Sequence, residues 1–153
     1  MRITSRGRYA LRASLVMAKL GKGGVPVSTN TLSEHENVSS VFLEQIFFKL
    51  RKAGIVKSIR GPGGGFCFNK PLEELTVKNI LDAVGENLDL TFCEKNKNDC
   101  PKIGKCLSHN VWVNANELIK DYFSKITLSS ILEKNEEKLT QEIIGGSEAE
   151  KHE

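Results

Sequence analysis

Apolar residues recur at intervals of three or four from Tyr9 to Leu20, which predicts an amphipathic helix. Thr4 or Ser5 can cap its start, because a hydroxyl oxygen there accepts a hydrogen bond from a free amide of the first turn. Gly21 and the glycines after it end the helix, and Pro26 prevents its continuation. The stripe expected to face the core consists of Tyr9, Ala13, Val16, Met17 and Leu20.

Two further helices follow with only a tight turn between them. The first is predicted over residues 29–36 with Ser28 as its cap, and Asn37 suits the turn because it tolerates left-handed backbone geometry. The second covers residues 38–51. Helix, turn and helix in this order are typical of a helix-turn-helix, whose second helix presents its first turns to the major groove of DNA, although many small helical domains share the pattern. The second helix has an apolar stripe of Leu43, Ile46, Phe47 and Leu50, with Val41, Glu44, Gln45 and Phe48 off the stripe.

A β-hairpin is predicted directly after these helices. Residues 55–59 alternate as a strand does, and the glycine-rich residues 60–65 join them to a second short strand, Phe66–Phe68. Placed after a helix-turn-helix, such a hairpin is the wing of a winged helix, and Arg60 at its rim suits a narrow minor groove. The alternative is a plain hairpin with a flexible turn. A phosphate-cradling loop is not indicated, because no Lys-Ser/Thr follows the glycines to open a helix.

Helical periodicity returns in the second half of the chain. Thr76 caps a helix that ends at Gly85, and a heptad-like apolar seam begins after His109. The remaining sequence is too short to cover this seam, so we expect it to pair with its twin in a homodimer. Folding back on the first helix is the alternative, and the helix can do both. A short helix is predicted over residues 127–132. The seam consists of Trp112, Ala115, Ile119, Tyr122 and Ile126.

Together these elements predict a mostly α-helical fold with a small β-hairpin wing. We expect a winged helix-turn-helix DNA-binding domain in residues 1–70. Residues 71–135 are expected to hold a cysteine-containing loop and the dimerisation helices. From residue 136 to residue 153 the chain is polar and acidic, and we expect a flexible tail.

Charge divides the chain into two halves. Residues 1–70 contain 12 Lys and Arg against 3 Asp and Glu, whereas residues 71–153 contain 10 against 16. A basic half suggests that one end of the molecule meets a polyanion such as double-stranded DNA. The sequence has no apolar run that would span a membrane and no signal-peptide pattern, so we expect a cytoplasmic protein.

A polar segment between the helix that ends at Gly85 and the seam that begins after His109 contains three cysteines and a histidine. Cys93, Cys100, Cys106 and His109 lie in a stretch whose proline, glycine and asparagines prevent a regular element. Such a loop normally needs a staple to become ordered, and thiolates with imidazole suit zinc or an iron–sulfur cluster. In a reducing compartment metal binding is a better default than disulfides. Unrelated surface thiols are the alternative. Cys67 alternates with two phenylalanines in a strand, and we leave it outside the site as a small apolar residue.

Five motifs in order resemble the IscR family of bacterial iron–sulfur cluster regulators. The resemblance covers residues 1–132. It implies a homodimeric winged-helix transcription factor that binds promoter DNA and carries a [2Fe–2S] cluster in its cluster-binding loop, with Cys93, Cys100, Cys106 and His109 as ligands. It also implies control of iron–sulfur cluster assembly genes, by repression or activation. The motifs are Arg2-Ile-Thr-Ser-Arg-Gly-Arg-Tyr-Ala10, Leu43-Glu-Gln-Ile-Phe47, Leu50-Arg-Lys-Ala-Gly-Ile-Val56, Arg60-Gly-Pro-Gly-Gly-Gly65 and Cys106-Leu-Ser-His109.

The same resemblance assigns roles to individual DNA-facing positions. Glu44 and Gln45 become base-reading candidates, and their chemistry agrees, since Glu accepts from cytosine and Gln pairs with adenine. The family's glutamate at the Glu44 position is thought to disfavour one promoter class without the cluster, so the cluster shifts operator choice. Two departures stand out: six residues rather than five separate Cys93 from Cys100, and Val41 replaces a frequent serine. The expected DNA contacts are Arg2, Ser40, Val41, Glu44, Gln45, Arg60, Gly61, Pro62 and Gly63.

Three rival readings share parts of this pattern. Sibling regulators that hold a [4Fe–4S] cluster and sense nitric oxide or iron have the fold and three cysteines, but lack the histidine found here as His109. A structural Cys3His zinc site would make the loop a fixed staple. A small electron-transfer or thiol-redox protein leaves the wing and the basic half unexplained. We expect neither an enzyme nor a small-molecule substrate, because no nucleophile, base and orienting residue form a set.

Overall fold

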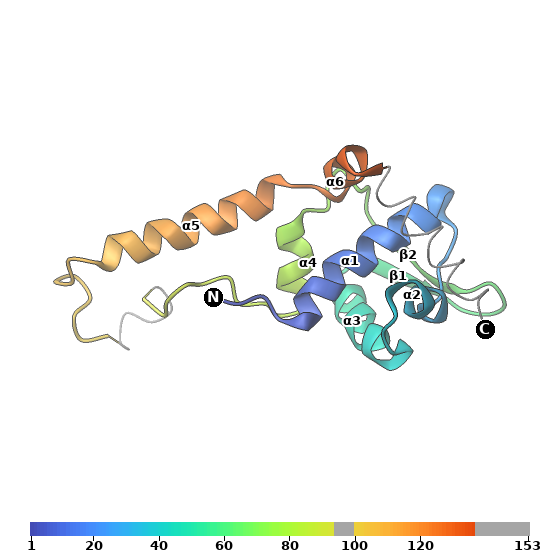
Figure 1. Cartoon of the computed structure of the whole chain (residues 1–153), viewed down its shortest axis with the longest axis horizontal. Helices are drawn as coiled ribbons and strands as arrows, with labels where there is room; N and C mark the ends of the chain where they lie inside the picture. Colours follow the sequence, from blue (N-terminus) through green and yellow to red (C-terminus); the bar gives the residue numbers. More distant parts are fainter. Residues whose placement is uncertain (94–99, 137–153) are drawn as a thin grey trace, which may run out of the picture.

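The computed structural model describes residues 1–93 and 100–136 of the chain. It consists of helices with one antiparallel hairpin, and α5 reaches away from the body formed by the other elements (Figure 1). The predicted mostly α-helical fold with a small wing is confirmed. The predicted tail lies outside the described residues from residue 137 onward, as do residues 94–99 of the cysteine loop. The elements are α1 (Ser5–Leu20), the 3-10 turn η1 (Lys22–Gly24), α2 (Thr29–Glu36), α3 (Ser40–Lys52), β1 (Val56–Ile59), β2 (Gly65–Phe68), α4 (Val77–Ala83), α5 (His109–Lys125) and α6 (Leu128–Lys134).

Local capping sets where most helices begin. The Ser28 hydroxyl accepts from the amide of Thr31 at 3.1 Å, and Thr76 forms a reciprocal capping box with Asn79. Ser39 caps α3 in the same way, so Ser40 is the first helical residue. Each cap satisfies an amide that has no partner within its own helix. The observed helix starts therefore follow from single side chains.

The main core lies between α1, α3 and the elements that close over them. Phe47 of α3 is fully buried, and burial of a side chain of this size contributes roughly 1.5–3 kcal/mol. Residues from both halves of the sequence enter the same cluster, because α4 and α6 pack against α1. The largest fully buried side chains are Phe47, Met17, Leu32, Leu43, Ile46, Leu50, Leu75, Ile80 and Leu128.

The hairpin is joined to the body along the outer edge of β2. In the register Val56 faces Phe68 and Ile59 faces Gly65. A further antiparallel bridge links Val27, just before α2, to Phe66, with amide-to-carbonyl distances of 2.9 and 2.8 Å. The wing therefore has a third, one-residue strand that the periodicity of the sequence did not predict.

Helix α5 packs partly within the chain. Ile119, Phe123 and Ile126 contact a second cluster formed by Val77, Leu81 and Leu88. Two residues of the predicted seam, Ile119 and Ile126, are thus partly covered within the chain, whereas Trp112 and Tyr122 of the same seam stay 39% and 62% exposed. Pairing of this seam with a second chain stays a prediction. The stripe that stays open contains Val111, Leu118 and Tyr122, which are 59%, 70% and 62% exposed. Packing against α4 uses one face of the helix and leaves the neighbouring face uncovered.

Gly65→Ala is expected to destabilise the fold by about 3 kcal/mol, because a Cβ there would collide with the backbone of Val27 and Ser28. Backbone atoms at the bridge cannot move aside without losing its hydrogen bonds. The matched control is Gly61→Ala, at a positive φ of 96° but with open space around the position, which we expect to cost about 1 kcal/mol. Urea unfolding at one fixed protein concentration measures both, and equal losses would contradict the clash.

Candidate nucleic-acid interface and metal-ligand loop

Helix α3 presents one polar face to solvent and buries the other. Val41 is 61% exposed, and Glu44 and Gln45 are also exposed. Ser40 is half-buried at the first position of the helix. The four stripe residues predicted for the inner face are fully buried, so the helix cannot rotate to present other side chains. Free donors and acceptors thus line the first turns of α3, where base edges are read in this class of motif.

The turn before α3 holds that helix at a fixed angle to α2. Asn37 adopts left-handed geometry with φ of 52° and ψ of 46°, as predicted. Glu36 is buried and forms an ion pair with Arg12 of α1, which links α2 to the long helix behind it. Because Asn37 and Glu36 fix the end of α2, the recognition face of α3 is held in place before any ligand binds.

The wing tip is an exposed loop supported by a rigid base. Gly61 and Gly63 have φ of 96° and 71°, and the amide of Gly64 donates to the carbonyl of Gly61 at 2.9 Å. Arg60, Gly61, Pro62 and Gly63 are all exposed. At the base, the rings of Phe47 and Phe66 lie 5.1 Å apart, so the wing packs directly on α3. The tip and the recognition face are consequently held by one packed unit.

Positive side chains lie at the last turn of α3 and near the N-terminus of the chain. Lys49, Arg51 and Lys52 occupy the last turn of α3, and the Arg51 guanidinium lies 5.5 Å from the centre of the exposed Phe48 ring. Arg2 is exposed just before α1. Such a distribution attracts phosphate without reading sequence, and the polar residues of α3 can then read the bases.

The described part of the cysteine loop is a series of tight turns. Between Cys100 and Cys106 the chain turns twice, with the amide of Ile103 on the carbonyl of Cys100 at 3.2 Å and that of Cys106 on Lys102 at 2.9 Å. The amide of His109 then donates to the carbonyl of Cys106 at 3.3 Å. His109 is the first residue of α5. Cys106 and His109 therefore share one turn at the start of the helix.

The Cys106 thiol lies in a polar environment that favours the thiolate. Its sulfur is 3.3 Å from the Ser108 hydroxyl oxygen. Hydrogen bonding to Ser108 is the main cause that lowers the pKa of Cys106 from its ordinary value, and the amide of His109 and the charge of Lys102 add to it. Thiolate is the form that binds metals, so this site suits a metal ligand.

The donor set fits a metal group in its chemistry. Cys93, Cys100 and Cys106 are free, partly exposed thiols, whereas Cys67 is buried in β2 at 8% exposure. Among residues 1–93 and 100–136, no three His, Cys, Asp or Glu side chains come together as a metal-binding group. The assignment of four ligands stays a prediction. Thiols and an imidazole that are accessible and free of disulfides are the groups such a site requires.

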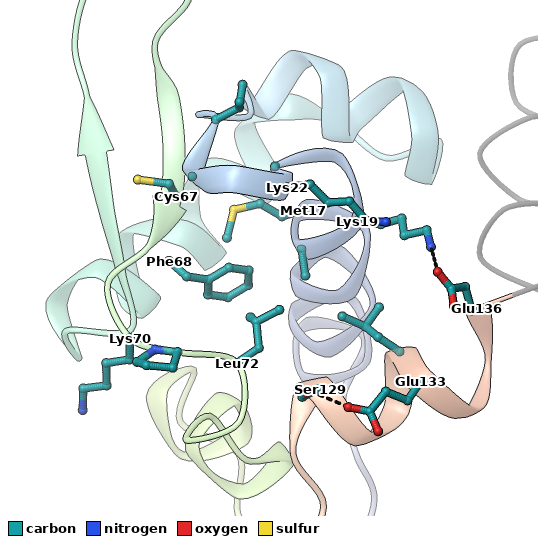
Figure 2. A pocket seen from close by; sticks show the side chains of 16 residues that line it. Met17, Lys19, Lys22, Cys67, Phe68, Lys70, Leu72, Ser129, Glu133 and Glu136 are labelled. Atoms are coloured by element: carbon teal, nitrogen blue, oxygen red, sulfur yellow. Dashed lines mark hydrogen bonds and ion pairs between the residues drawn. The ribbon is translucent and has the colours of Figure 1, made fainter.

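A separate cavity lies between the C-terminal half of α1, the base of β2 and α6 (Figure 2). Its volume is about 440 Å³, and Phe68 and Leu72 line one side of it. An ion pair of 3.1 Å between Lys19 and Glu136 joins α1 to the end of α6 and appears dashed in Figure 2. Of the described residues, none from α3 or the cysteine loop lines this cavity. It is therefore distinct from both candidate sites.

Sequence reasoning missed a set of polar contacts beside the cysteine loop. Glu86 is buried and accepts hydrogen bonds from Thr4, 82 residues away. Asp89 pairs with Lys120 at 2.8 Å, and the side-chain oxygen of fully buried Asn116 accepts from the Leu90 amide at 2.7 Å. No local pattern could have indicated these pairs, because each joins residues more than 20 positions apart.

These features define a winged helix-turn-helix DNA-binding protein. They are a recognition helix with an exposed polar face, a glycine-tipped wing packed on that helix, and basic side chains in its last turn. A family model described as Rrf2, an iron-dependent transcriptional regulator, matches residues 3–134. The chain belongs to the Rrf2 family of transcriptional regulators. None of the described helices has the length and apolar character needed to cross a membrane.

Named relatives and solved structures agree with this assignment. The chain is 40% identical over 136 residues to the HTH-type transcriptional regulator IscR of Vibrio campbellii, which covers 89% of this chain and 80% of the relative. It is 39% identical over 136 residues to IscR of Pectobacterium carotovorum, covering 89% and 82%. The T. potens IscR structure superposes with a TM-score of 0.71 at 29% identity, covering 90% of each chain. CymR, the global cysteine regulator of B. subtilis, gives a TM-score of 0.69 at 25% identity, covering 88% and 98%. These proteins are regulators, and this chain is a transcriptional regulator rather than an enzyme.

Proposed function

We propose that this regulator senses iron–sulfur cluster status through a [2Fe–2S] cluster bound by Cys93, Cys100, Cys106 and His109. The observation that carries the proposal is a histidine and three free, accessible thiols attached to a winged-helix regulator. Relatives of about 40% identity are named IscR, a name shared with the family whose motifs the sequence resembles. The cluster, when bound, supplies a labile group whose occupancy follows iron–sulfur supply. The genes controlled in this proposal are those of cluster assembly.

The chain's own residues supply the ligation chemistry in this proposal. A lowered pKa at Cys106 favours the metal-binding thiolate. His109 is neutral as a ligand where a fourth cysteine would be anionic, so ligation by His109 raises the reduction potential and makes binding dependent on pH. Both properties suit a group that is gained and lost as supply changes.

The proposed DNA contacts divide into two groups with different tasks. Ser40, Val41, Glu44 and Gln45 enter the major groove, where the Val41 side chain packs on a thymine methyl group. Arg60 enters the narrow minor groove beside the wing tip. The remaining contacts, which position the protein on the backbone, are Arg2, Gly61, Pro62 and Gly63. We further propose a homodimer through α5, and a cytoplasmic location in which the free thiols persist.

Anaerobic purification followed by an absorption spectrum with iron and acid-labile sulfide counts tests the cluster. About two irons and two sulfides per chain would support the proposal. Four of each would instead indicate the sibling type of regulator, and a colourless protein with zinc would leave a DNA binder whose loop is a fixed staple. Selection of duplexes from a random library by the wild-type protein then provides the operator fragment. A steep fall of affinity with salt on that fragment separates a regulator from an electron carrier.

Arg60→Ala is expected to weaken operator binding roughly 10- to 100-fold, because an exposed guanidinium at the wing rim is lost from the minor groove. The stability of the fold should not change, since the side chain is exposed. Lys134→Ala, which removes an exposed positive charge from α6, serves as the matched control and should leave affinity unchanged. Fluorescence anisotropy with the selected fragment measures both variants, and an equal loss in both would indicate a general charge effect.

A further inference from the structure

A short segment between α4 and Cys93 is bonded to the start of α1. The amide of Thr4 donates to Oε2 of Glu86 at 3.1 Å, and the Thr4 hydroxyl donates to Oε1. The same hydroxyl oxygen accepts from the amide of Gly7 at 3.3 Å and caps α1. Glu86 is only 9% exposed. Its carboxylate therefore fixes the residue on which the first turn of the long helix depends.

The surface of α1 is shaped for this carboxylate. A Cβ built on Gly7 would lie 2.6 Å from Cγ of Glu86, so only glycine allows the side chain to lie this close to the helix. Gly85, directly before it, has φ of 79°, a left-handed geometry that turns the chain out of α4 toward α1. The contact between Glu86 and Thr4 therefore depends on two glycines, Gly7 and Gly85, whose geometry makes room for it.

The other end of the segment is bonded to α5. Asp89, with its side chain 7% exposed, pairs with Lys120 at 2.8 Å. The Leu90 amide donates to the fully buried Asn116 at 2.7 Å. Leu88, between these contacts and Glu86, is buried in the second apolar cluster. Residues 86–90 thus lie alongside α5 with contacts on both sides, as the path of the chain in Figure 1 also shows.

We propose that Glu86 is a positioning residue that couples the occupancy of the Cys93 site to the DNA-contacting N-terminus. The proposal rests on the function proposed above. Only two residues separate Cys93 from Leu90, whose amide is bonded to Asn116. Because this connection is short, a displacement of Cys93 on ligation displaces residues 86–90 as well. A shift of that segment changes the hydrogen bonds that Thr4 donates to Glu86, and Arg2 lies two residues before Thr4. Linkage then requires that DNA binding at this end changes cluster retention by the same factor.

The test compares operator affinity with and without the cluster in three proteins: wild type, Glu86→Gln and Glu36→Gln. Glu36 is the matched control, because it is also a buried carboxylate bonded to α1, through Arg12, but it belongs to α2 and not to the segment before Cys93. Affinity for the selected duplex is measured by anisotropy after anaerobic loading and after cluster removal. We expect Glu86→Gln to reduce the ratio of loaded to empty affinity at least about 5-fold, the lower end of common coupling factors. Glu36→Gln should lower stability or both affinities and leave that ratio unchanged.

Hydrogen exchange of the Thr4 and Gly7 amides in the wild-type protein gives a second readout that needs no variant. Cluster loading should change their protection at least about 5-fold if the segment transmits the event. The role of Glu86 would be overturned if Glu86→Gln left the ratio of loaded to empty operator affinity unchanged, or if both variants lowered that ratio equally. It would also be overturned if cluster loading left the protection of the Thr4 and Gly7 amides unchanged. A wild-type protein that binds no iron and sulfide would instead overturn the proposed function itself.

Discussion

Replacing Cys106 by alanine is expected to remove nearly all iron and acid-labile sulfide from the anaerobically purified protein. The reason is chemical, because the variant loses the thiolate whose lowered pKa favours metal binding. The turn should persist, since the Cys106 amide bonds to Lys102 through the backbone at 2.9 Å. The side chain is partly exposed, so no core cavity forms. Iron falling from about two per chain to below about a tenth of that is the expected result.

Cys67→Ala is the control for this substitution. Cys67 is also a free thiol but is buried in β2 at 8% exposure, away from the loop. We expect it to keep full iron and sulfide while losing about 1 kcal/mol of stability. Retention of iron by Cys106→Ala, or loss of iron by Cys67→Ala, would contradict the ligand assignment. Urea unfolding and circular dichroism show whether each variant has kept its fold.

Leu118→Glu is expected to convert the protein to a monomer and to weaken operator binding at least about 100-fold. Leu118 is 70% exposed on α5, on the open stripe with Val111 and Tyr122. A two-fold axis through this stripe would bring the same residue from both chains together, and two carboxylates in an apolar contact cost several kcal/mol. Since winged-helix dimers bind two half-sites, a monomer would also lose about half of the salt dependence of binding.

Sedimentation velocity and anisotropy on the selected duplex measure the two effects. Glu117→Gln is the matched control, because it changes the charge of an exposed neighbour on the same helix turn and should leave the dimer intact. The circular dichroism of Leu118→Glu should match the wild type, as an exposed side chain is being replaced. A dimer of unchanged affinity in Leu118→Glu would show that the chains associate through another surface.

The α5 helix marks the boundary between what a sequence pattern can and cannot predict. The heptad-like spacing correctly indicated a long helix, because periodicity is a local property of the chain. Ile119 and Ile126 of the predicted seam are partly covered by Val77 and Leu81 of α4, whereas Trp112 and Tyr122 of that seam stay exposed. Two apolar stripes on one helix look alike in sequence. Only the position of α4 decided which stripe is covered within the chain and which stays open.

The candidate site shows the same division. Cys93, Cys100, Cys106 and His109 could be predicted as ligands from residue type and spacing, since ligand chemistry belongs to the side chains themselves, and this assignment stays a prediction. The exposed polar face of α3 followed from its period. The hydrogen bond between Cys106 and the Ser108 hydroxyl, which lowers the pKa of the thiol, depends on the fold of the loop and could not be predicted from the spacing.

By itself the sequence determined the elements whose causes lie within a few residues. The serine and threonine caps, the left-handed turn at Asn37 and the glycine tip of the wing each arise from a side chain and its near neighbours. The tertiary structure alone decided the contacts between distant segments. One such contact is the β-bridge between Val27 and Phe66, and another is the hydrogen bond that Thr4 donates to Glu86. No local sequence pattern links the two members of either pair. Such pairs form because packing of the core brings segments together and buried polar groups then require partners.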